Sequence, residues 1–269
     1  MEDPKVRIKS SFQSDGALVI TCFPSVGMVT SVVGHYLIEH LDLEYIGGVF
    51  DSRLPAVALI QDGAPMPPVR AYAGKPECNL EGCEQIILLM SEIILKEPIV
   101  NEISWALMEW SKEQNLVGGV IVDSFPKAGM KGGLDGSEPV VEYEDTEGID
   151  LLGIGTTKNS RTRLEGLGIP LLTQGVIKGM NASLLGEARR RGLDVMGIMA
   201  EADPRFPDAR SAAEIIKKLD QILEMADLDH KPLIEEAEFL ESQLRGMIEM
   251  AQDETKSKGG SSPNSMLYG

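Results

Sequence analysis

The sequence predicts an α/β protein with a central mixed, largely parallel sheet that is flanked by helices. Short apolar runs alternate with segments of helical periodicity along most of the chain, and this alternation is typical of βαβ units. Several runs are apolar throughout, as expected for strands that helices cover on both faces. With 269 residues, 43% of them hydrophobic, the chain is long enough for one large domain and an appended helical segment.

Seven apolar runs are predicted as strands. They are residues 17–23, 45–50, 56–60, 85–90, 117–122, 151–154 and 193–199. Because helical patterns separate many of these runs, we expect crossover connections, which join strands that lie parallel in one sheet.

Three helices are predicted between the strands, at about residues 27–41, from Pro98 onward and at about 181–191. The second places Ile99, Ile103, Ala106, Leu107 and Trp110 on one face. The third carries Leu184, Leu185 and Ala188 inward, and its last turn holds Arg189, Arg190 and Arg191 before Gly192. Cations and a following glycine are favoured where a helix ends, so we interpret the basic triplet as a helix terminus and not as an anion site.

The chain is expected to divide into an α/β core at 1–208, a helical pair at 209–251 and a disordered tail at 252–269. The two helical patterns are residues 209–228 and 233–251. The second has apolar residues at spacings of 4, 3, 4 and 3, namely Leu233, Ala237, Leu240, Leu244 and Met247. Such a seam packs an antiparallel pair either on the sheet or across a subunit interface, and the pattern leaves both alternatives open.

Composition excludes several classes of function. The formal net charge of −17 argues against a general nucleic-acid binder, because affinity for phosphate backbones comes largely from lysine and arginine. It also argues against adhesion to anionic membranes. No run approaches the roughly 20 apolar residues of a membrane span, and residues 1–5 lack a signal-peptide pattern. We expect a soluble cytoplasmic protein.

The cysteines predict neither disulfides nor a metal site. Cys22, Cys78 and Cys83 form an odd and sparse set, which is typical of a reducing compartment. Cys78 and Cys83 have no histidine nearby and are therefore poor zinc ligands. No P-loop occurs in the chain, and we predict no cofactor.

A Phe-Pro-Ser-Val-Gly turn at residues 23–27 joins the first long strand to the first helix. A serine at such a turn suggests a nucleophile, but a nucleophile elbow requires glycine where Phe23 stands. His35 and His40 are five residues apart and do not share a helix face, so nothing specifies a Ser-His-Asp triad.

We interpret this turn as structural. Ser25 is expected to cap the helix, and Gly27 is expected to let helix and strand approach closely. Pro24, Val26 and Gly27 form the predicted turn signature, and no catalytic residue is assigned.

A second strand-to-helix turn holds Gly153, Gly155, Thr156 and Thr157. Its backbone N–H groups could receive an anion. The turn lacks the third glycine and the acidic ribose partner of a dinucleotide site. A small-molecule site near the carboxyl ends of the strands remains an alternative.

The end of the chain combines a polar segment with a compact set of recognition groups. Residues 252–265 bury too little apolar surface to offset the entropy of ordering, so we expect a mobile tether. Leu267, Tyr268 and the carboxylate of Gly269 offer an apolar anchor, an aromatic hydroxyl and a negative charge. We interpret this end as a built-in ligand for another protein. The alternative is that the ending is a chance one.

Three segments have a distinctive order and spacing. The first is the turn at 23–29 with the later segments 36–38 and 43–47; the second is residues 174–185; the third is the connector at 206–212. Together they resemble the proteasome assembly chaperone family, in the branch named for its second eukaryotic member. The match spans roughly residues 15 to 250, and Ala209 departs from the second proline of the family's connector.

The resemblance implies a nucleoside-phosphorylase-like sandwich that serves as a binding scaffold and not as an enzyme. It also implies homo-oligomers, and a role for the hydrophobic–Tyr–any (HbYX) ending in binding the α-ring of the core proteasome. Leu267 and Tyr268 match that motif, and Gly269 occupies its free position.

We therefore predict a non-enzymatic protein that docks its tail on the α subunits of the core proteasome, as assembly chaperone, ATP-independent activator or both. One three-residue anchor binds weakly, so we expect a tetramer or another multimer that presents several tails. Two alternatives stay open: a nucleoside- or nucleotide-processing enzyme on the same fold, and a scaffold that binds another protein through its C-terminal helices.

Overall fold

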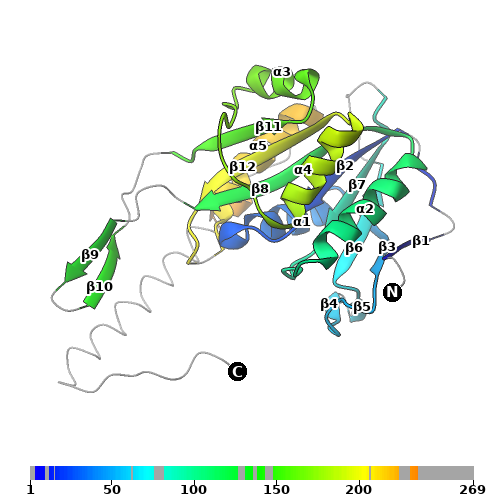
Figure 1. Cartoon of the computed structure of the whole chain (residues 1–269), viewed down its shortest axis with the longest axis horizontal. Coiled ribbons are helices and arrows are strands. Elements are labelled where there is room, and N and C mark those ends of the chain that lie inside the picture. The colour runs from blue at the N-terminus through cyan, green and yellow to red at the C-terminus, as the bar shows by residue number, and fades with distance from the viewer. Residues whose placement is uncertain are drawn as a thin grey trace.

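The protein is described by a computed structural model. It covers residues 4–9, 12–14, 16–61, 63–75, 82–126, 131–135, 138–142, 148–205, 207–223 and 231–235, with backbone alone at 131–142. Within this part of the chain, one eight-stranded sheet lies between two layers of helices (Figure 1). The predicted α/β architecture, a mixed sheet flanked by helices, is confirmed.

The sheet has a parallel centre and antiparallel flanks. Its order is β1 (Lys5–Ile8), β3 (Glu44–Phe50), β6 (Val69–Gly74), β7 (Gln85–Met90), β2 (Ala17–Cys22), β8 (Leu116–Pro126), β12 (Val195–Ala202) and β11 (Leu151–Gly155). β7, β2, β8 and β12 run parallel. The remaining pairs are antiparallel. Two separate ribbons join β4 (Leu59–Gln61) to β5 (Ala64–Met66) and β9 (Lys131–Asp135) to β10 (Glu138–Glu142).

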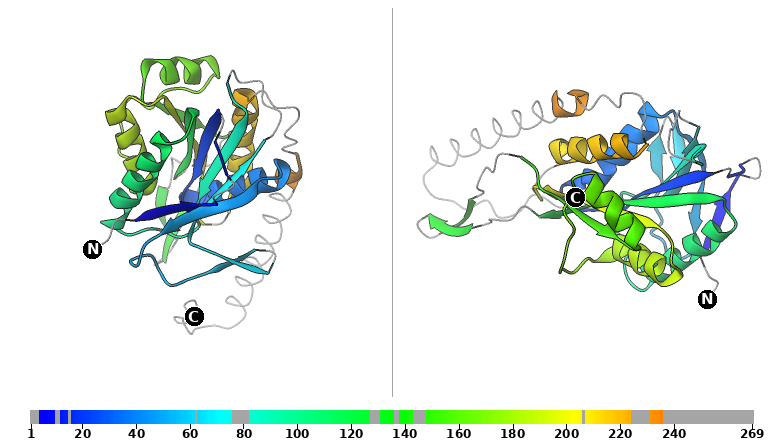
Figure 2. Two further views of the ribbon diagram at one scale, coloured as in Figure 1. Left: turned by 90° about the vertical axis from the view of Figure 1, so that its right-hand side faces the viewer. Right: turned by 90° about the horizontal axis from the view of Figure 1, so that it is seen from above.

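Two helices cover each face of the sheet. α1 (Val29–His40) and α5 (Ala209–Leu223) pack together on one face, and α2 (Ile99–Lys112) and α4 (Gly179–Arg191) pack together on the other. Figure 2 shows the three layers edge-on. α3 (Lys158–Gly166) lies beside β11 at the edge of the sheet.

The alternation of side chains along β2 explains the two layers. Leu18, Ile20 and Cys22 belong to the core on the α1–α5 side, whereas Ala17 and Val19 face the α2–α4 side. Both sets are apolar because the strand is covered on both faces. Burial raises the pKa of the Cys22 thiol far above its ordinary value, so it is an inert core residue.

Local geometry shifts some of the predicted elements. The expected strand at 56–60 is largely wrong: only Leu59 and Ile60 are extended, in the β4–β5 ribbon. The segment before it turns because Arg53 N donates to Asp51 Oδ1 at 2.8 Å. α1 begins at Val29 and not at Gly27, since Gly27 and Met28 have positive φ angles of 60° and 49°.

The predicted helical pair lies partly within the described residues. α5 begins at Ala209 as expected and is described as far as Leu223, and residues 231–235 are helical. Leu233 packs into the core on the α1–α5 side. The rest of the second helix and the tail from 252 onward lie outside the described residues. No helix in the described ranges has the length and apolarity to span a membrane.

Candidate functional site

The turn after β2 is held by contacts from both of its ends. Ser25 has an extended backbone and precedes a single 3-10 turn at Val26–Met28. Its Oγ accepts the backbone N–H of Thr30 at 3.4 Å and lies 3.2 Å from the Thr30 hydroxyl, to which it donates. The N-cap residue of α1 is thus Met28 and not Ser25, which reaches the first turn only through Thr30. The Ser25 hydroxyl has no histidine partner among the described contacts.

Gly27 is locked against the segment that joins β12 to α5. Its carbonyl accepts the backbone N–H of Asp208 at 2.8 Å. A Cβ atom at this position would lie 2.7 Å from the carbonyl oxygen of Asp203. A glycine is thus required both for its positive φ and for the close approach of this connector.

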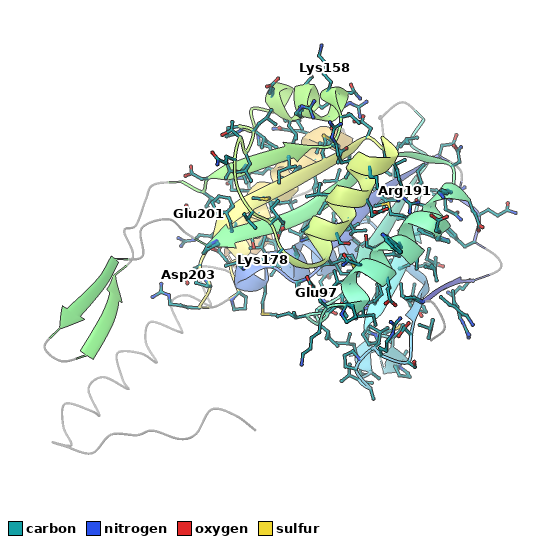
Figure 3. All side chains as sticks on the ribbon, in the orientation of Figure 1. Glu97, Lys158, Lys178, Arg191, Glu201 and Asp203 are labelled. Atoms are coloured by element: carbon teal, nitrogen blue, oxygen red, sulfur yellow. The ribbon has the colours of Figure 1, made fainter. Side chains whose placement is uncertain are left out.

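The carboxyl ends of the parallel strands lie together at one end of the sheet, which we call its carboxyl edge. From β2 the chain passes through α1 toward β3, and from β8 it passes toward β11 on the opposite side of the sheet. Open α/β sheets form a crevice where neighbouring strands diverge in this way. Figure 3 shows Lys178, Glu201 and Asp203 at this edge, with Lys158 and Arg191 away from it.

A pocket of about 500 Å³ occupies this crevice. We call it the switch-point pocket and define it by its lining residues: Pro24, Ser25, Val26, Ile94, Asp123, Ser124, Phe125, Pro126, Val176, Ile177, Lys178 and Met199. The predicted turn residues Pro24 and Val26 form one wall, and the end of β8 forms another. Gly27 lies behind this wall and does not line the pocket.

Asp123 is the acidic group of the switch-point pocket. Its Oδ1 accepts the backbone N–H of Ser124 at 2.8 Å, and Asn181 donates a side-chain hydrogen bond. Burial outweighs these two bonds and raises the pKa of Asp123 to about 6. The adjacent Ser124 hydroxyl donates to the carbonyl of Val26 at 2.6 Å and so ties β8 to the turn.

A second polar cluster lies at the same edge, after β7. Arg70, only 2% exposed, donates to Glu92 at 2.5 Å and to the Tyr72 hydroxyl at 3.0 Å. His35 contacts the same Glu92 oxygen at 2.9 Å. Burial opposes ionisation of Glu92, yet the bonds from His35 and Arg70 prevail and hold its pKa at about 2. The cluster is an ion-pair network that anchors α1 and β6 to the end of β7, although Arg70 Nη1 and Glu92 Oε2 are buried without a hydrogen-bond partner.

The histidines do not form a catalytic triad with Ser25. His35 is bound to Glu92, and His40 contacts the carbonyl of Tyr36 at 3.1 Å and stacks on its ring. His230 and Cys78 lie outside the described residues. Among the residues that are described, no group of three histidine, cysteine or acidic side chains is arranged to hold a metal ion.

The turn at Gly153 and Gly155 lies at the opposite edge of the sheet, where the parallel strands have their amino-terminal ends. Its helix, α3, is capped from within the chain: Thr157 Oγ1 accepts the N–H of Ser160 at 3.0 Å, and Ser160 Oγ accepts the N–H of Thr157 at 2.9 Å. The Thr156 N–H donates to the carbonyl of Val195 at 3.1 Å. Three N–H groups of this turn, those of Thr156, Thr157 and Ser160, are therefore already bonded.

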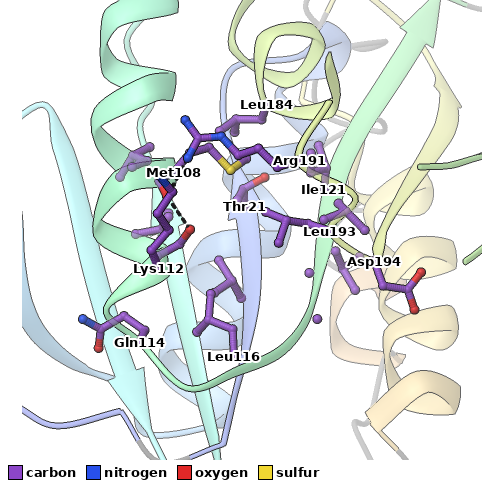
Figure 4. A pocket seen from close by; sticks show the side chains of 18 of the residues that line it. Thr21, Met108, Lys112, Gln114, Leu116, Ile121, Leu184, Arg191, Leu193 and Asp194 are labelled. Atoms are coloured by element: carbon purple, nitrogen blue, oxygen red, sulfur yellow. Dashed lines mark hydrogen bonds between the residues drawn. The ribbon is translucent and has the colours of Figure 1, made fainter. Parts of the chain in front are cut away.

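A larger cavity of about 590 Å³ lies at that amino-terminal edge, between α2, α4 and the sheet (Figure 4). Its floor contains Thr21, whose buried hydroxyl has no hydrogen-bond partner. The two cations on its wall are engaged: Arg191 pairs with Glu109 at 2.8 Å, and Lys112 pairs with the same residue at 2.7 Å. Asp194, the acidic residue of the lining, accepts hydrogen bonds from Thr157 and Asn159, so the charged groups of this largely apolar cavity are engaged among the residues described.

The basic triplet has the structural role that its position predicts. Gly192 ends α4 with a φ of 72°. Arg189 donates to the carbonyl of Thr156 at 3.0 Å, and Arg191 reaches α2 through Glu109. The arginines thus connect the end of α4 to neighbouring elements.

A model of the PAC2 family matches residues 19–248 of this chain. The chain belongs to the PAC2 family. This match confirms the predicted family resemblance, and it includes the turn after β2, the switch-point pocket and the start of the C-terminal helices. Predicted docking residues Leu267, Tyr268 and Gly269 lie beyond the match and outside the described residues.

Solved structures similar to this PAC2-family chain share its whole architecture. PbaA of Pyrococcus furiosus, an archaeal homologue of proteasome-assembly chaperone, is 28% identical, with a TM-score of 0.78 over 95% of this chain and 96% of its own. PbaB of the same organism, an archaeal proteasome activator, is 16% identical, with a TM-score of 0.72 over 92% and 99%, which is a likeness of fold. A comparison of sequences alone gives a further relative, an uncharacterised protein of Methanocaldococcus jannaschii. It is 27% identical over 246 residues, which are 90% of this chain and 89% of that protein.

Proposed function

We propose that this PAC2-family chain is a non-enzymatic partner of the core proteasome, as an assembly chaperone, an ATP-independent activator or both. The observation that carries the proposal is the 28% identity to PbaA, an archaeal homologue of proteasome-assembly chaperone, over 95% of this chain. The fold shared with PbaB, an archaeal proteasome activator, is consistent with it.

The contact that we propose is made by the end of the chain. Leu267 enters an apolar pocket between neighbouring α subunits, Tyr268 packs beside it, and the carboxylate of Gly269 pairs with a lysine of the ring. The hydrophobic–Tyr–any pattern of these residues supports this assignment. Because one short anchor binds weakly, the proposal includes a cytoplasmic homo-oligomer whose tails engage several pockets at once.

The geometry gives less support to a nucleotide-processing enzyme. That alternative needs an anion site at the start of α3, where Thr157 and Ser160 already bond each other's backbone N–H groups. A scaffold that acts through its C-terminal helices remains the competing binding function, and deletion of the tail separates the two.

The test is hydrolysis of a fluorogenic peptide by purified core proteasome from the same organism, without nucleotide. Full-length protein should stimulate hydrolysis, and a chain that ends at Ser265 should not. Tyr268→Ala should also fail to stimulate hydrolysis. It is matched to the full-length protein, because it removes the aromatic side chain but keeps the length and the carboxylate. Equal stimulation by all three proteins would contradict tail docking and favour binding through the folded body.

A second measurement separates the two proposed roles. Proteasome α and β subunits are mixed with full-length or truncated protein, and the yield of assembled particles is measured over time. A tail-dependent rise in yield supports assembly chaperoning. Stimulated hydrolysis by mature particles, with an unchanged yield, supports activation alone.

A further inference from the structure

The switch-point pocket holds a carboxyl group that forms no ion pair within the described residues. The Asp123 carboxylate receives the N–H of Ser124 at 2.8 Å and a side-chain bond from Asn181, and both donors are uncharged. A carboxylate shielded from water is costly unless a charged partner pairs with it. The site therefore offers a strong acceptor to a ligand that carries a positive charge.

The two hydroxyl groups of the pocket are already engaged. Ser25 Oγ contacts the Thr30 backbone and hydroxyl. The Ser124 hydroxyl donates to the Val26 carbonyl at 2.6 Å. Asp123 is consequently the hydrogen-bond acceptor most available to a ligand in this crevice of about 500 Å³.

Apart from Lys178, the exposed part of the pocket lining is largely apolar. Ile94 and Val176 line it, and their exposed fractions of 78% and 86% are the highest among the large hydrophobic residues of the described chain. Phe125 and Ile177 contribute further apolar wall, both partly buried. An apolar mouth above a carboxylate complements a methylene stem that ends in an ammonium group.

We propose that the switch-point pocket binds a lysine side chain of a protein partner, whose ammonium pairs with Asp123 and whose stem packs between Ile94 and Val176. This site lies on the folded body and is independent of the C-terminal tail, so it goes beyond the proposed docking of that tail.

Two observations favour a protein partner over a free amine. A small amine would fill the crevice but would leave Ile94 and Val176 exposed at its mouth, whereas residues that flank a lysine in a partner would cover them. The net charge of −17 also attracts a basic surface over a distance.

The charges that face Asp123 from neighbouring elements are of both signs. Lys178, at the start of α4, lines the pocket and is exposed. Glu201 lies on the same side of β12 as Met199, which is the Cα partner of Asp123. Because Lys178 repels an incoming ammonium, Lys178→Met should tighten binding about two- to threefold.

The test uses two acetylated and amidated tripeptides, Leu-Lys-Leu and Leu-Gln-Leu, with 1,4-diaminobutane as the free amine. Binding to the full-length protein is followed by NMR chemical-shift titration. The lysine peptide should bind at least tenfold more tightly than the glutamine peptide, and Asp123→Asn should abolish that difference. Val176→Ser should weaken the lysine peptide about threefold and leave the amine unchanged.

The pH dependence provides an internal control. With the Asp123 pKa at about 6, the ionised fraction rises roughly tenfold between pH 5 and pH 7. Affinity for the lysine peptide should rise by the same factor, and it should stay constant in Asp123→Asn.

Three outcomes would overturn the proposal. Equal binding of the lysine and glutamine peptides would show that the carboxylate is not the recognition group. Loss of binding in Lys178→Met would assign recognition to the rim cation. Diaminobutane that binds as tightly as the peptide, with no effect of Val176→Ser, would make the pocket a site for small amines.

Discussion

Two acidic residues at the carboxyl edge of the sheet have pKa values that move in opposite directions. Glu92 and Asp123 are both partly buried. Glu92 accepts hydrogen bonds from His35 and Arg70, which lower its pKa to about 2 despite burial. Asp123 has neutral donors, and burial raises its pKa to about 6. Partners, and not depth, decide the direction of each shift.

Glu92→Gln should lower the free energy of unfolding at pH 7 by about 3 kcal/mol, because Arg70 then keeps a buried charge without an anionic partner. The folded pKa of Glu92 lies below its ordinary value of 4.5, so the carboxylate stabilises fully above that value and loses its effect as the pH falls toward 2. In urea titrations, the difference in the free energy of unfolding between the wild type and Glu92→Gln should be smaller at pH 3 than at pH 7. His35→Asn is the control: its side chain is 54% exposed, so a change below about 1 kcal/mol is expected.

Asp123→Asn should stabilise the protein at high pH. The folded pKa of about 6 exceeds the ordinary 3.8, so the folded state holds the proton more tightly. The stabilisation that the bound proton gives the folded state is complete below about pH 4 and is lost as the pH rises through 6. At pH 8 the variant should be about 2–3 kcal/mol more stable than the wild type, and at pH 4 the two should be equal. A stability difference that does not change with pH would contradict this.

At the scale of elements, continuous apolar runs were predictable and mixed strands were not. The run at 85–90 matches β7 residue for residue because each of its side chains is buried. β6 was missed, although nearly all of its residues are buried as in β7. A charged residue such as Arg70 indicates an exposed position unless its pairing with Glu92 is known. β1 was missed because its four residues alternate charged and apolar side chains.

The turn after β2 was predictable and the pocket beside it was not. Proline, serine and glycine between a strand and a helix mark a turn from local chemistry alone. Asp123 follows an apolar run but still lies within β8, which continues to Pro126. Its approach to Pro24 and Val26 depends on which strands become neighbours. Sequence periodicity does not specify that order.

Gly27→Ala should destabilise the protein by about 2–4 kcal/mol, since a Cβ at φ 60° is strained and would lie 2.7 Å from the carbonyl oxygen of Asp203. Gly63→Ala is the matched control: its φ is 76°, and a Cβ there meets nothing within 4 Å. We expect about 1–2 kcal/mol for the control, by urea denaturation of both variants. Equal losses would show that the connector yields and that conformational strain alone accounts for the effect.

At the scale of the whole molecule, the C-terminal helices are the expected basis of assembly. Leu233 already packs on the core, so residues 231–235 belong to the folded body. The heptad-like seam that continues beyond them is predicted to join protomers.

Light scattering at micromolar concentration should give a multiple of the 29.2 kDa chain mass. A chain that ends at residue 235 keeps Leu233 on the core and should be monomeric. A chain that ends at residue 251 should form the same oligomer as the full-length protein. A monomeric full-length protein would contradict the multivalent docking that we propose. An oligomer that persists in the shortest chain would place the interface on the α/β core.

During synthesis, β2 leaves the ribosome long before either of its neighbours in the sheet exists. Leu18 pairs with Ile86 and Gly118, which follow it by 68 and 100 residues. At about 5–20 residues per second, the second partner emerges roughly 5–20 s after the strand. Such long-range pairing makes folding slow and leaves a strand that is apolar on both faces open to aggregation. A protein that we propose to assist another assembly thus depends on protection in the first seconds of its own synthesis.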